Sequence, residues 1–194
     1  MQKISRLLLK LTGWQLDENV PRLDRYVMIA YPHTSNWDFV LGMLARWALD
    51  LPFNWVAKHS IFRWPVKSLF IAMGGVPLDR EKTTGFIQKN IKLFRQRQKF
   101  ILGLMPEGTR SRAERWKTGF YHIAQGAGVP IALAYIDYRT KSIGVGMILQ
   151  PCGDIESDFE RIRQFYQDKT GYRPENQSAL RIVNSPRQHH NSPD

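Results

Sequence analysis

The segment YVMIAYPHTSNWDFVLGMLARWALD, residues 26–50, holds the pattern from which the fold class follows. Residues 26–31 form a short apolar run that ends before a proline, which is typical of a buried strand. After a polar turn, apolar side chains recur at helical spacing as far as Asp50, namely Phe39, Val40, Met43, Leu44, Trp47 and Ala48. The segment therefore predicts a strand, a turn and a helix in succession.

The same alternation continues along the chain. Short apolar runs predict further strands at residues 54–58, 76–79, 99–105, 129–137 and 143–149. Helical patterns lie between or after them, at 60–72, from Thr83 or Thr84 through Phe94, at 120–127 and at 158–169. Strands alternating with helices predict a single α/β domain over residues 1–194, an αβα sandwich around a largely parallel sheet.

Composition limits the partners and the compartment. The chain has 194 residues and a formal net charge of +11, from 28 Lys and Arg against 17 Asp and Glu. Such a charge favours a polyanionic partner, such as nucleic acid, an acidic membrane or a phosphorylated substrate. Cys152 is the single cysteine, so no internal disulfide forms and a reducing, cytoplasmic location is expected. No apolar run reaches the roughly 20 residues that span a bilayer.

The two ends of the chain differ from the middle. Residues 1–13 predict a basic amphipathic helix, with Ile4, Leu7, Leu8 and Leu11 on one stripe and Lys3, Arg6 and Lys10 beside it. Such a helix either lies in an anionic membrane interface or packs on the domain core. Beyond Gly171 the periodicity fades, and residues 172–194 are expected to be a tail.

Polar segments follow three of the predicted strands, at residues 32–38, 74–80 and 106–112. In open α/β sheets, sites gather at the carboxyl ends of strands. In the first segment a turn can bring His33 and Asp38 together, so that the carboxylate fixes the tautomer and leaves the other ring nitrogen as a general base. The alternative is that Asp38 favours the helix N-terminus and His33 is incidental.

The other two segments each carry an arginine, Arg80 and Arg110, at a strand-to-helix loop. A guanidinium there can bind a phosphate through two hydrogen bonds, although a single such arginine is more often a solvated surface residue. The nucleotide-binding patterns G-x-G-x-x-G and G-x4-G-K-[ST] are absent, and so is the G-x-S-x-G pattern of serine hydrolases.

Taken together, the three segments resemble the motifs of the glycerolipid acyltransferase family, the 1-acylglycerol-3-phosphate acyltransferase-like proteins. The sequence HTSNWD at 33–38 is similar to the first motif, H-x4-D, GVPLDR at 75–80 to the second, and PEGTRS at 106–111 to the third. The sequence VPI at 129–131 resembles the start of the fourth. Met105 replaces a common phenylalanine, and residues 132–134 lack the second proline frequent in the fourth motif.

This resemblance implies transfer of an acyl chain from acyl-CoA or acyl-carrier protein to the hydroxyl of a lysophospholipid-like acceptor. It implies that His33 is the general base and that Asp38 orients it, with no metal and no bound cofactor. It further implies an acceptor site formed by Arg80, Glu107, Gly108, Thr109 and Arg110, of which the two arginines bind the acceptor phosphate. The expected partners are an anionic membrane surface and, where it is the donor, acyl-carrier protein. The protein is expected to be peripheral and to reach the membrane from the cytoplasmic side, and nucleic acid is not an expected partner.

Two other functions use the same positive charge. A nucleic-acid-binding module would need a basic stripe with stacking aromatic residues or a known binding motif, and neither is found. A phosphatase would need a carboxylate cluster suited to two metals, and none is found. Substitution of His33 separates the classes, because it would abolish catalysis and leave nucleic-acid affinity almost unchanged.

Overall fold

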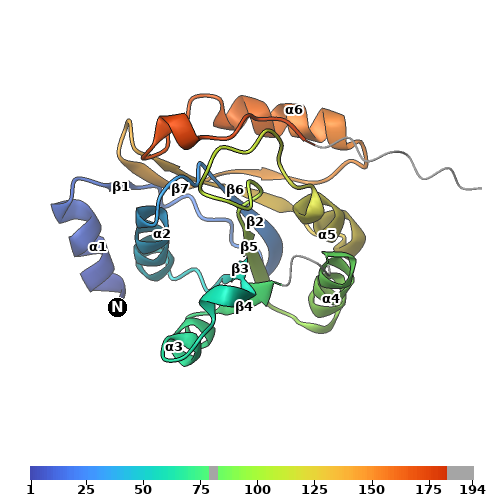
Figure 1. The fold of residues 1–194 in the computed structure, drawn as a ribbon, viewed down its shortest axis with the longest axis horizontal. Coiled ribbons are helices and arrows are strands. Elements are labelled where there is room, and N and C mark those ends of the chain that lie inside the picture. Colours follow the sequence, from blue (N-terminus) through green and yellow to red (C-terminus); the bar gives the residue numbers. More distant parts are fainter. Residues whose placement is uncertain (79–82, 183–194) are drawn as a thin grey trace, which may run out of the picture.

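The computed structural model describes residues 1–78 and 83–182. The strands within these residues form one seven-stranded sheet. The strands are β1 (Gln15–Leu16), β2 (Arg25–Tyr31), β3 (Asn54–Lys58), β4 (Gly75–Leu78), β5 (Phe100–Leu104), β6 (Ile131–Asp137) and β7 (Ser142–Leu149). Their order is β1-β7-β6-β2-β5-β3-β4, and every neighbouring pair is parallel except β6 and β7. The largely parallel sheet expected from the sequence is confirmed (Figure 1).

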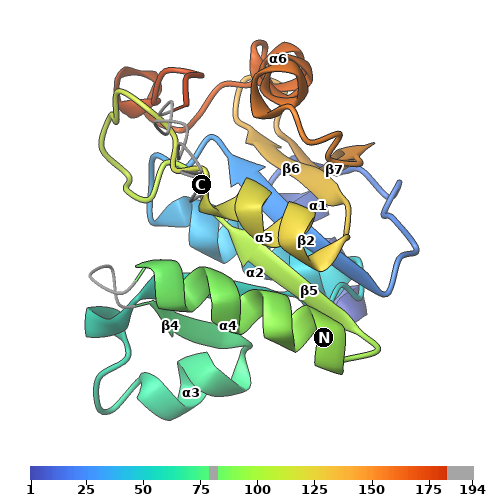
Figure 2. The same ribbon diagram turned by 90° about the vertical axis from the view of Figure 1, so that its right-hand side faces the viewer.

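Helices cover both faces of the sheet, which gives the three layers of an αβα sandwich (Figure 2). One face carries α1 (Gln2–Leu11), α2 (Trp37–Ala48) and α3 (Lys67–Ala72), and the other carries α4 (Thr83–Gln96), α5 (Gly119–Ala127) and α6 (Ile155–Tyr166). Short 3-10 turns span His59–Ile61 and Pro174–Asn176. Within the described residues, no helix is both long enough and apolar enough to cross a membrane.

Side chains of β2 alternate between two apolar cores, one on each face of the sheet. Val27 and Ile29 pack with residues of α4, α5 and α6, whereas Tyr26 and Met28 pack with Met43 of α2. Successive side chains of a strand point to opposite faces, so a fully apolar strand requires cover on both sides. The apolar run at 26–31 therefore explains why β2 lies in the middle of the sandwich.

The predicted helix at residues 60–72 is only partly correct. A 3-10 turn precedes Phe62, and α3 begins only at Lys67. Pro65 has no backbone N–H to donate, and it disfavours helical geometry at Trp64, the residue before it. The sequence also gave no sign of β1, a two-residue strand that pairs with the start of β7.

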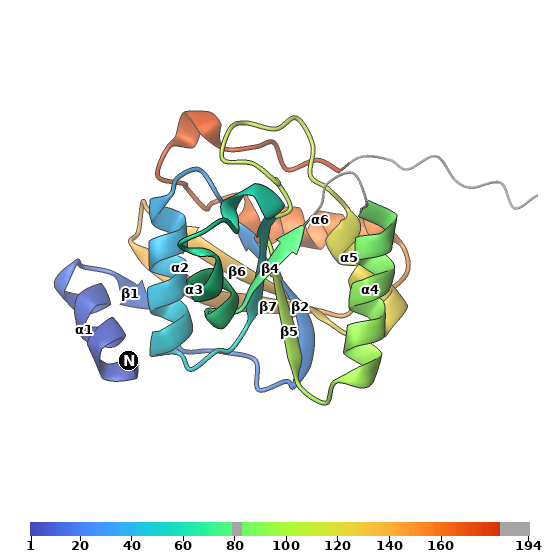
Figure 3. The same cartoon turned by 60° about the horizontal axis from the view of Figure 1, so that its bottom comes forward.

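The carboxyl ends of β6, β2 and β5 lie side by side at one edge of the sheet, because these three strands are neighbours. The segments that follow β2 and β5 begin at Pro32 and Met105, and Tyr138 follows β6. Figure 3 shows the loop after β5 and the C-terminal segment, residues 171–182, at this same end of the sheet. The topology thus brings together residues that lie up to about 150 positions apart in the sequence.

Candidate active site

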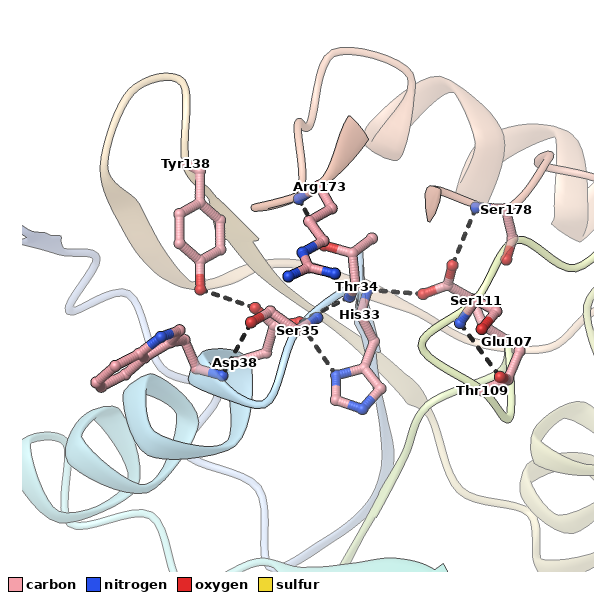
Figure 4. Close-up of polar contacts among 11 residues, drawn as sticks. His33, Thr34, Ser35, Asp38, Glu107, Thr109, Ser111, Tyr138, Arg173 and Ser178 are labelled. Carbon is pink, nitrogen blue, oxygen red and sulfur yellow. Dashed lines mark hydrogen bonds and ion pairs between the residues drawn. The ribbon is translucent and has the colours of Figure 1, made fainter. Parts of the chain in front are cut away.

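The turn after β2 is organised by one carboxylate. Asp38 lies in the first turn of α2, and its Oδ2 accepts hydrogen bonds from the N–H groups of Thr34 (2.7 Å) and Ser35 (2.8 Å). A carboxylate is stabilised at this end of a helix by the helix dipole. The two bonds fold the turn back on α2, so that the imidazole of His33 lies beside Asp38 (Figure 4).

His33 and Asp38, five positions apart in sequence, form a side-chain pair. Nδ1 of His33 lies 3.3 Å from Oδ2 of Asp38, and the two side chains are 13% and 2% exposed. The other carboxylate oxygen, Oδ1, accepts a hydrogen bond of 2.8 Å from the hydroxyl of Tyr138. In Figure 4 the second ring nitrogen, Nε2, points away from Asp38, as a general base facing a substrate would.

The surroundings of Asp38 favour its ionised form. Burial alone would raise the pKa of this carboxyl, but hydrogen bonds from His33, from the Ser35 N–H and from Tyr138 outweigh burial and lower the pKa below its usual 3.8. Burial and Asp38 together raise the pKa of the Tyr138 hydroxyl, which therefore stays protonated and donates. A buried negative charge beside the imidazole holds its Nδ1–H toward Asp38.

Glu107 lies on the other side of His33, and its hydrogen-bond partners are two backbone N–H groups and the side chain of Ser178. Its Oε2 accepts a 2.6 Å hydrogen bond from the His33 N–H, and its Oε1 accepts one of 3.1 Å from the Ser178 N–H. Burial raises the pKa of Glu107 above its usual 4.5, against the hydrogen bonds that lower it. Glu107 thus ties the backbone of the β2 turn to the loop after β5 and to the C-terminal segment.

The C-terminal segment, residues 171–182, packs across the site. The Arg173 N–H donates to the hydroxyl of Thr34 (3.1 Å), and the Tyr31 hydroxyl donates to the Ser178 carbonyl (2.9 Å). A parallel bridge joins Ile182 to Trp116. These residues fall within the predicted tail 172–194, but as far as Ile182 they are part of the folded domain; residues 183–194 lie outside the described residues.

Two cavities meet at His33. One, of about 70 Å³, runs between α2 and the sheet and is almost entirely apolar, with Met28, Leu51 and Phe53 among its lining residues. The other, of about 360 Å³, combines an apolar wall with cations, and its charged lining residues are Lys58, Arg110 and Lys117. His33 lines both cavities, whereas Glu107 lines neither.

Of the other residues expected in the acceptor site, three line the larger cavity and one lies outside the described residues. Gly108, Thr109 and the exposed Arg110 all line the larger cavity. Gly108 has a φ of 66°, and an added Cβ would lie 3.2 Å from Cε of Lys117, so a side chain there would be strained and crowded. Arg80 lies outside the described residues. Within residues 1–78 and 83–182, no group of three or more His, Cys, Asp or Glu side chains could hold a metal ion.

Sequence reasoning missed several residues of this site. Tyr138 directly follows the predicted strand 129–137, so its position at the carboxyl end of a strand could have identified it. Lys58 is the last residue of the predicted strand 54–58 and could have been found by the same signal, whereas Lys117 follows the third motif. Ser178 lies in a stretch without periodicity, so the sequence gave no sign that its N–H and its side chain would reach Glu107.

Comparison with known proteins supports the motifs. The sequence model of a protein family described as Acyltransferase matches residues 14–136, more than half of the chain. The matched range contains His33, Asp38 and the loop at 106–112. The match confirms the family resemblance expected from those segments.

Two individual proteins are similar to this chain. A 1-acyl-sn-glycerol-3-phosphate acyltransferase of Escherichia coli (strain K12) is 30% identical over 123 residues, which are 60% of this chain and 49% of that protein. The chain thus spans about half the length of this curated relative. The solved structure of the 1-acyl-sn-glycerophosphate (LPA) acyltransferase PlsC from Thermotoga maritima has a TM-score of 0.56 at 18% identity, over 86% of this chain and 73% of that chain. This likeness shows a shared fold.

Proposed function

Because the chain belongs to the acyltransferase family, we propose that it transfers a fatty acyl group from a thioester to the hydroxyl of a lysophospholipid-like acceptor. The donor is an acyl-CoA or an acyl-carrier protein. The acceptor is of the 1-acylglycerol-3-phosphate type, which the name of the Escherichia coli relative suggests. The alternative, a nucleic-acid-binding module without catalysis, has no comparable support.

The observation that carries this proposal is the position of His33 between an apolar and a basic cavity. An acyl chain gains about 0.8 kcal/mol for each methylene it buries, so the apolar cavity suits the part of the chain next to the thioester. The basic cavity suits a phosphorylated acceptor, because Arg110 and Lys117 can both bind phosphate. In this arrangement the thioester carbonyl and the acceptor hydroxyl meet at the imidazole.

The proposed reaction needs one base. Nε2 of His33 takes the proton from the acceptor hydroxyl, whose oxygen attacks the thioester carbonyl and forms a tetrahedral intermediate. The intermediate collapses, the carbon–sulfur bond breaks, and the departing thiolate takes the proton back from the imidazolium. Asp38 stabilises the transient positive charge on His33, and Tyr138 holds Asp38 in place. No acyl group becomes attached to the protein.

A lipid acceptor requires contact with a membrane, and α1 is suited to provide it from the cytoplasmic face. Ser5 and Leu9 are buried toward the domain, whereas the predicted stripe is exposed, with Leu7 at 55% and Leu11 at 74%. The exposure of this stripe supports membrane contact, while α1 packs on the domain through Ser5 and Leu9. Lys3 and Lys10 would bind anionic lipid, at about 1 kcal/mol for each Lys near the surface. Arg6 instead pairs with Glu18 and donates to the Ala48 carbonyl.

Transfer by the purified chain tests the proposal. Acyl-CoA or acyl-carrier protein is mixed with 1-acylglycerol-3-phosphate in detergent micelles, and the products are identified by mass spectrometry. We expect a diacylated phospholipid and one free thiol per transfer, with far less product from monoacylglycerol, which lacks the phosphate. The absence of transfer from either donor to the phosphorylated acceptor would contradict the proposal.

A pair of arginine variants tests the basic cavity. Arg110→Ala should raise the acceptor KM by roughly ten- to a hundredfold, because a hydrogen bond to a charged group is worth about 1.5–3 kcal/mol. Arg112→Ala is the matched control, since Arg112 is an exposed arginine of the same loop that does not line the cavity. Equal KM values for the two variants would remove Arg110 from the acceptor site.

A further inference from the structure

Besides the stripe of α1, a second exposed apolar surface lies on the connection between β3 and β4. In this segment, residues 59–72, the side chain of Trp64 is 91% exposed and that of Leu69 is 57% exposed. Ile61, Val66 and Ile71 are also exposed, and α3 contains no buried residue. Several large apolar side chains in contact with water on one short segment indicate an interaction surface.

The segment is held by a firm support. Phe62 stacks on Trp55 of β3 at a ring distance of 5.7 Å, and Phe70 of α3 meets the same indole edge-on at 5.6 Å. Phe70 also contacts Phe39 of α2 at 6.1 Å. Two phenylalanines thus anchor the segment on the domain, and the exposed Trp64 lies between them in the sequence.

The charge of the segment fits an anionic surface. Residues 51–78 contain Lys58, Arg63 and Lys67 and no Asp or Glu. Cations that surround exposed apolar side chains are typical of segments that lie in a membrane interface, where tryptophan is also enriched. The same cations would repel each other in a symmetric contact between two copies of this segment, which argues against a second copy as the partner.

The segment also borders the candidate active site. Ile61 of the segment and Lys58, which directly precedes it, line the basic cavity together with His33. A lipid that leaves a membrane at this segment therefore reaches the cavity without first crossing water. The segment 59–72 is placed where an acceptor with a long acyl chain would enter.

We propose that the segment 59–72 is a second membrane-docking element, which inserts Trp64, Leu69 and Ile71 into an anionic lipid leaflet beside the entrance to the basic cavity. The proposal rests on the proposed function for the lipid nature of the substrate. It adds to α1 a contact that lies at the site itself.

Binding to vesicles tests this element. The full chain and Trp64→Ala are sedimented with vesicles of phosphatidylcholine containing phosphatidylglycerol, and with vesicles of phosphatidylcholine alone. Trp64 is exposed in the free protein and would be buried in the leaflet. Its loss should therefore weaken binding to the anionic vesicles roughly ten- to a hundredfold. Leu69→Ser should weaken it less. Leu23→Ser is the matched control, since Leu23 is 43% exposed and precedes β2, at the opposite end of the sheet, and its binding should stay unchanged.

Two results would overturn the proposal. One is equal binding by the full chain and Trp64→Ala. The other is a dimer in sedimentation velocity that Trp64→Ala dissociates, which would assign the surface to a second copy. Transfer to a short-chain, water-soluble acceptor should be equal in both proteins; if neither transfers, the proposed function fails while the vesicle result still decides the docking element.

Discussion

The two sides of His33 use the same chemical group for different purposes. Asp38 and Glu107 are both buried carboxylates, and each accepts hydrogen bonds through both oxygens. Yet the pKa of Asp38 is lowered and that of Glu107 is raised. Asp38 has the imidazole and a phenol hydroxyl beside it in addition to backbone N–H groups. The hydrogen bonds that Glu107 accepts, from the side chain and N–H of Ser178 and from the His33 N–H, do not fully offset its burial.

This difference suggests separate roles, in which Asp38 acts through its charge and Glu107 through the position of the His33 backbone. Asp38 touches the imidazole, so in the proposed reaction its negative charge would act on the ring that moves the proton. Glu107 holds the backbone N–H of the same histidine, so it acts on the position of the ring and on the closure of the site. Substitutions that remove charge and keep shape should therefore have different effects on the two sides.

The largest expected effect is on the Asp38 side. Asp38→Asn keeps the size of the side chain but removes the charge that stabilises the imidazolium, so turnover should fall by about 10²–10⁴, the usual worth of a positioned base. Steady-state transfer assays measure this effect. Asp158→Asn is the matched control, because Asp158 is equally buried, accepts from Tyr121 and the Cys152 N–H, and lies outside both cavities. Loss of turnover in the control as well would point to general destabilisation.

On the Glu107 side the effect should appear first in stability. Glu107→Gln has one accepting oxygen for two N–H donors, so one buried group loses its partner, at a cost of about 1–3 kcal/mol in the free energy of unfolding. Turnover should fall less than in Asp38→Asn. Denaturant unfolding measures the loss, with exposed Glu114→Gln as the control. A larger loss of turnover than in Asp38→Asn would reverse the roles given to the two carboxylates.

How far the sequence predicts this site depends on where each partner lies in the chain. The residues His33 and Asp38 are near neighbours, so the turn between them allows the pair, and the resemblance of residues 33–38 to the H-x4-D motif implies it. Glu107 could be placed at the correct edge of the sheet, because it follows an apolar strand. Its actual partners could not be predicted, since two of them are backbone N–H groups, and Ser178, which also contributes its side chain, lies in a stretch without periodicity.

The fold follows the same rule. Long apolar runs and helical periods predicted the layers and most boundaries, because cover on both faces leaves a strong pattern in each strand. Failures occurred where local patterns are short or interrupted, at the two-residue β1 and around Pro65. Packing of residues 171–182 on the site depends on contacts with distant elements, which leave no period in the sequence.

A smaller effect, with opposite signs on the two sides, should appear in the pH dependence of stability. The Asp38 pKa is lowered by folding, so its stabilisation is complete above pH 3.8 and is lost as the pH falls through the lowered pKa. The Glu107 pKa is raised, so the folded state gains stability as the pH falls through the raised value and stops gaining below 4.5.

Free energies of unfolding, measured from about pH 3 to pH 7, report the contributions of both carboxyl groups to stability. The difference in the free energy of unfolding between the wild type and Asp38→Asn should shrink toward the acidic end of this range. The difference between the wild type and Glu107→Gln should grow as the pH falls toward 4.5. Slopes of the same sign for the two variants would contradict the contrast between the carboxylates.

The most direct test of the central claim is acyl transfer by His33→Ala, compared with the wild type and with His122→Ala. His122 is an exposed histidine of α5 that lines neither cavity. With thermal unfolding curves showing that all three proteins are folded, we predict a loss of about 10²–10⁴ in turnover for His33→Ala and no change for His122→Ala. Turnover of His33→Ala close to that of the wild type would contradict the assignment of His33 as the general base.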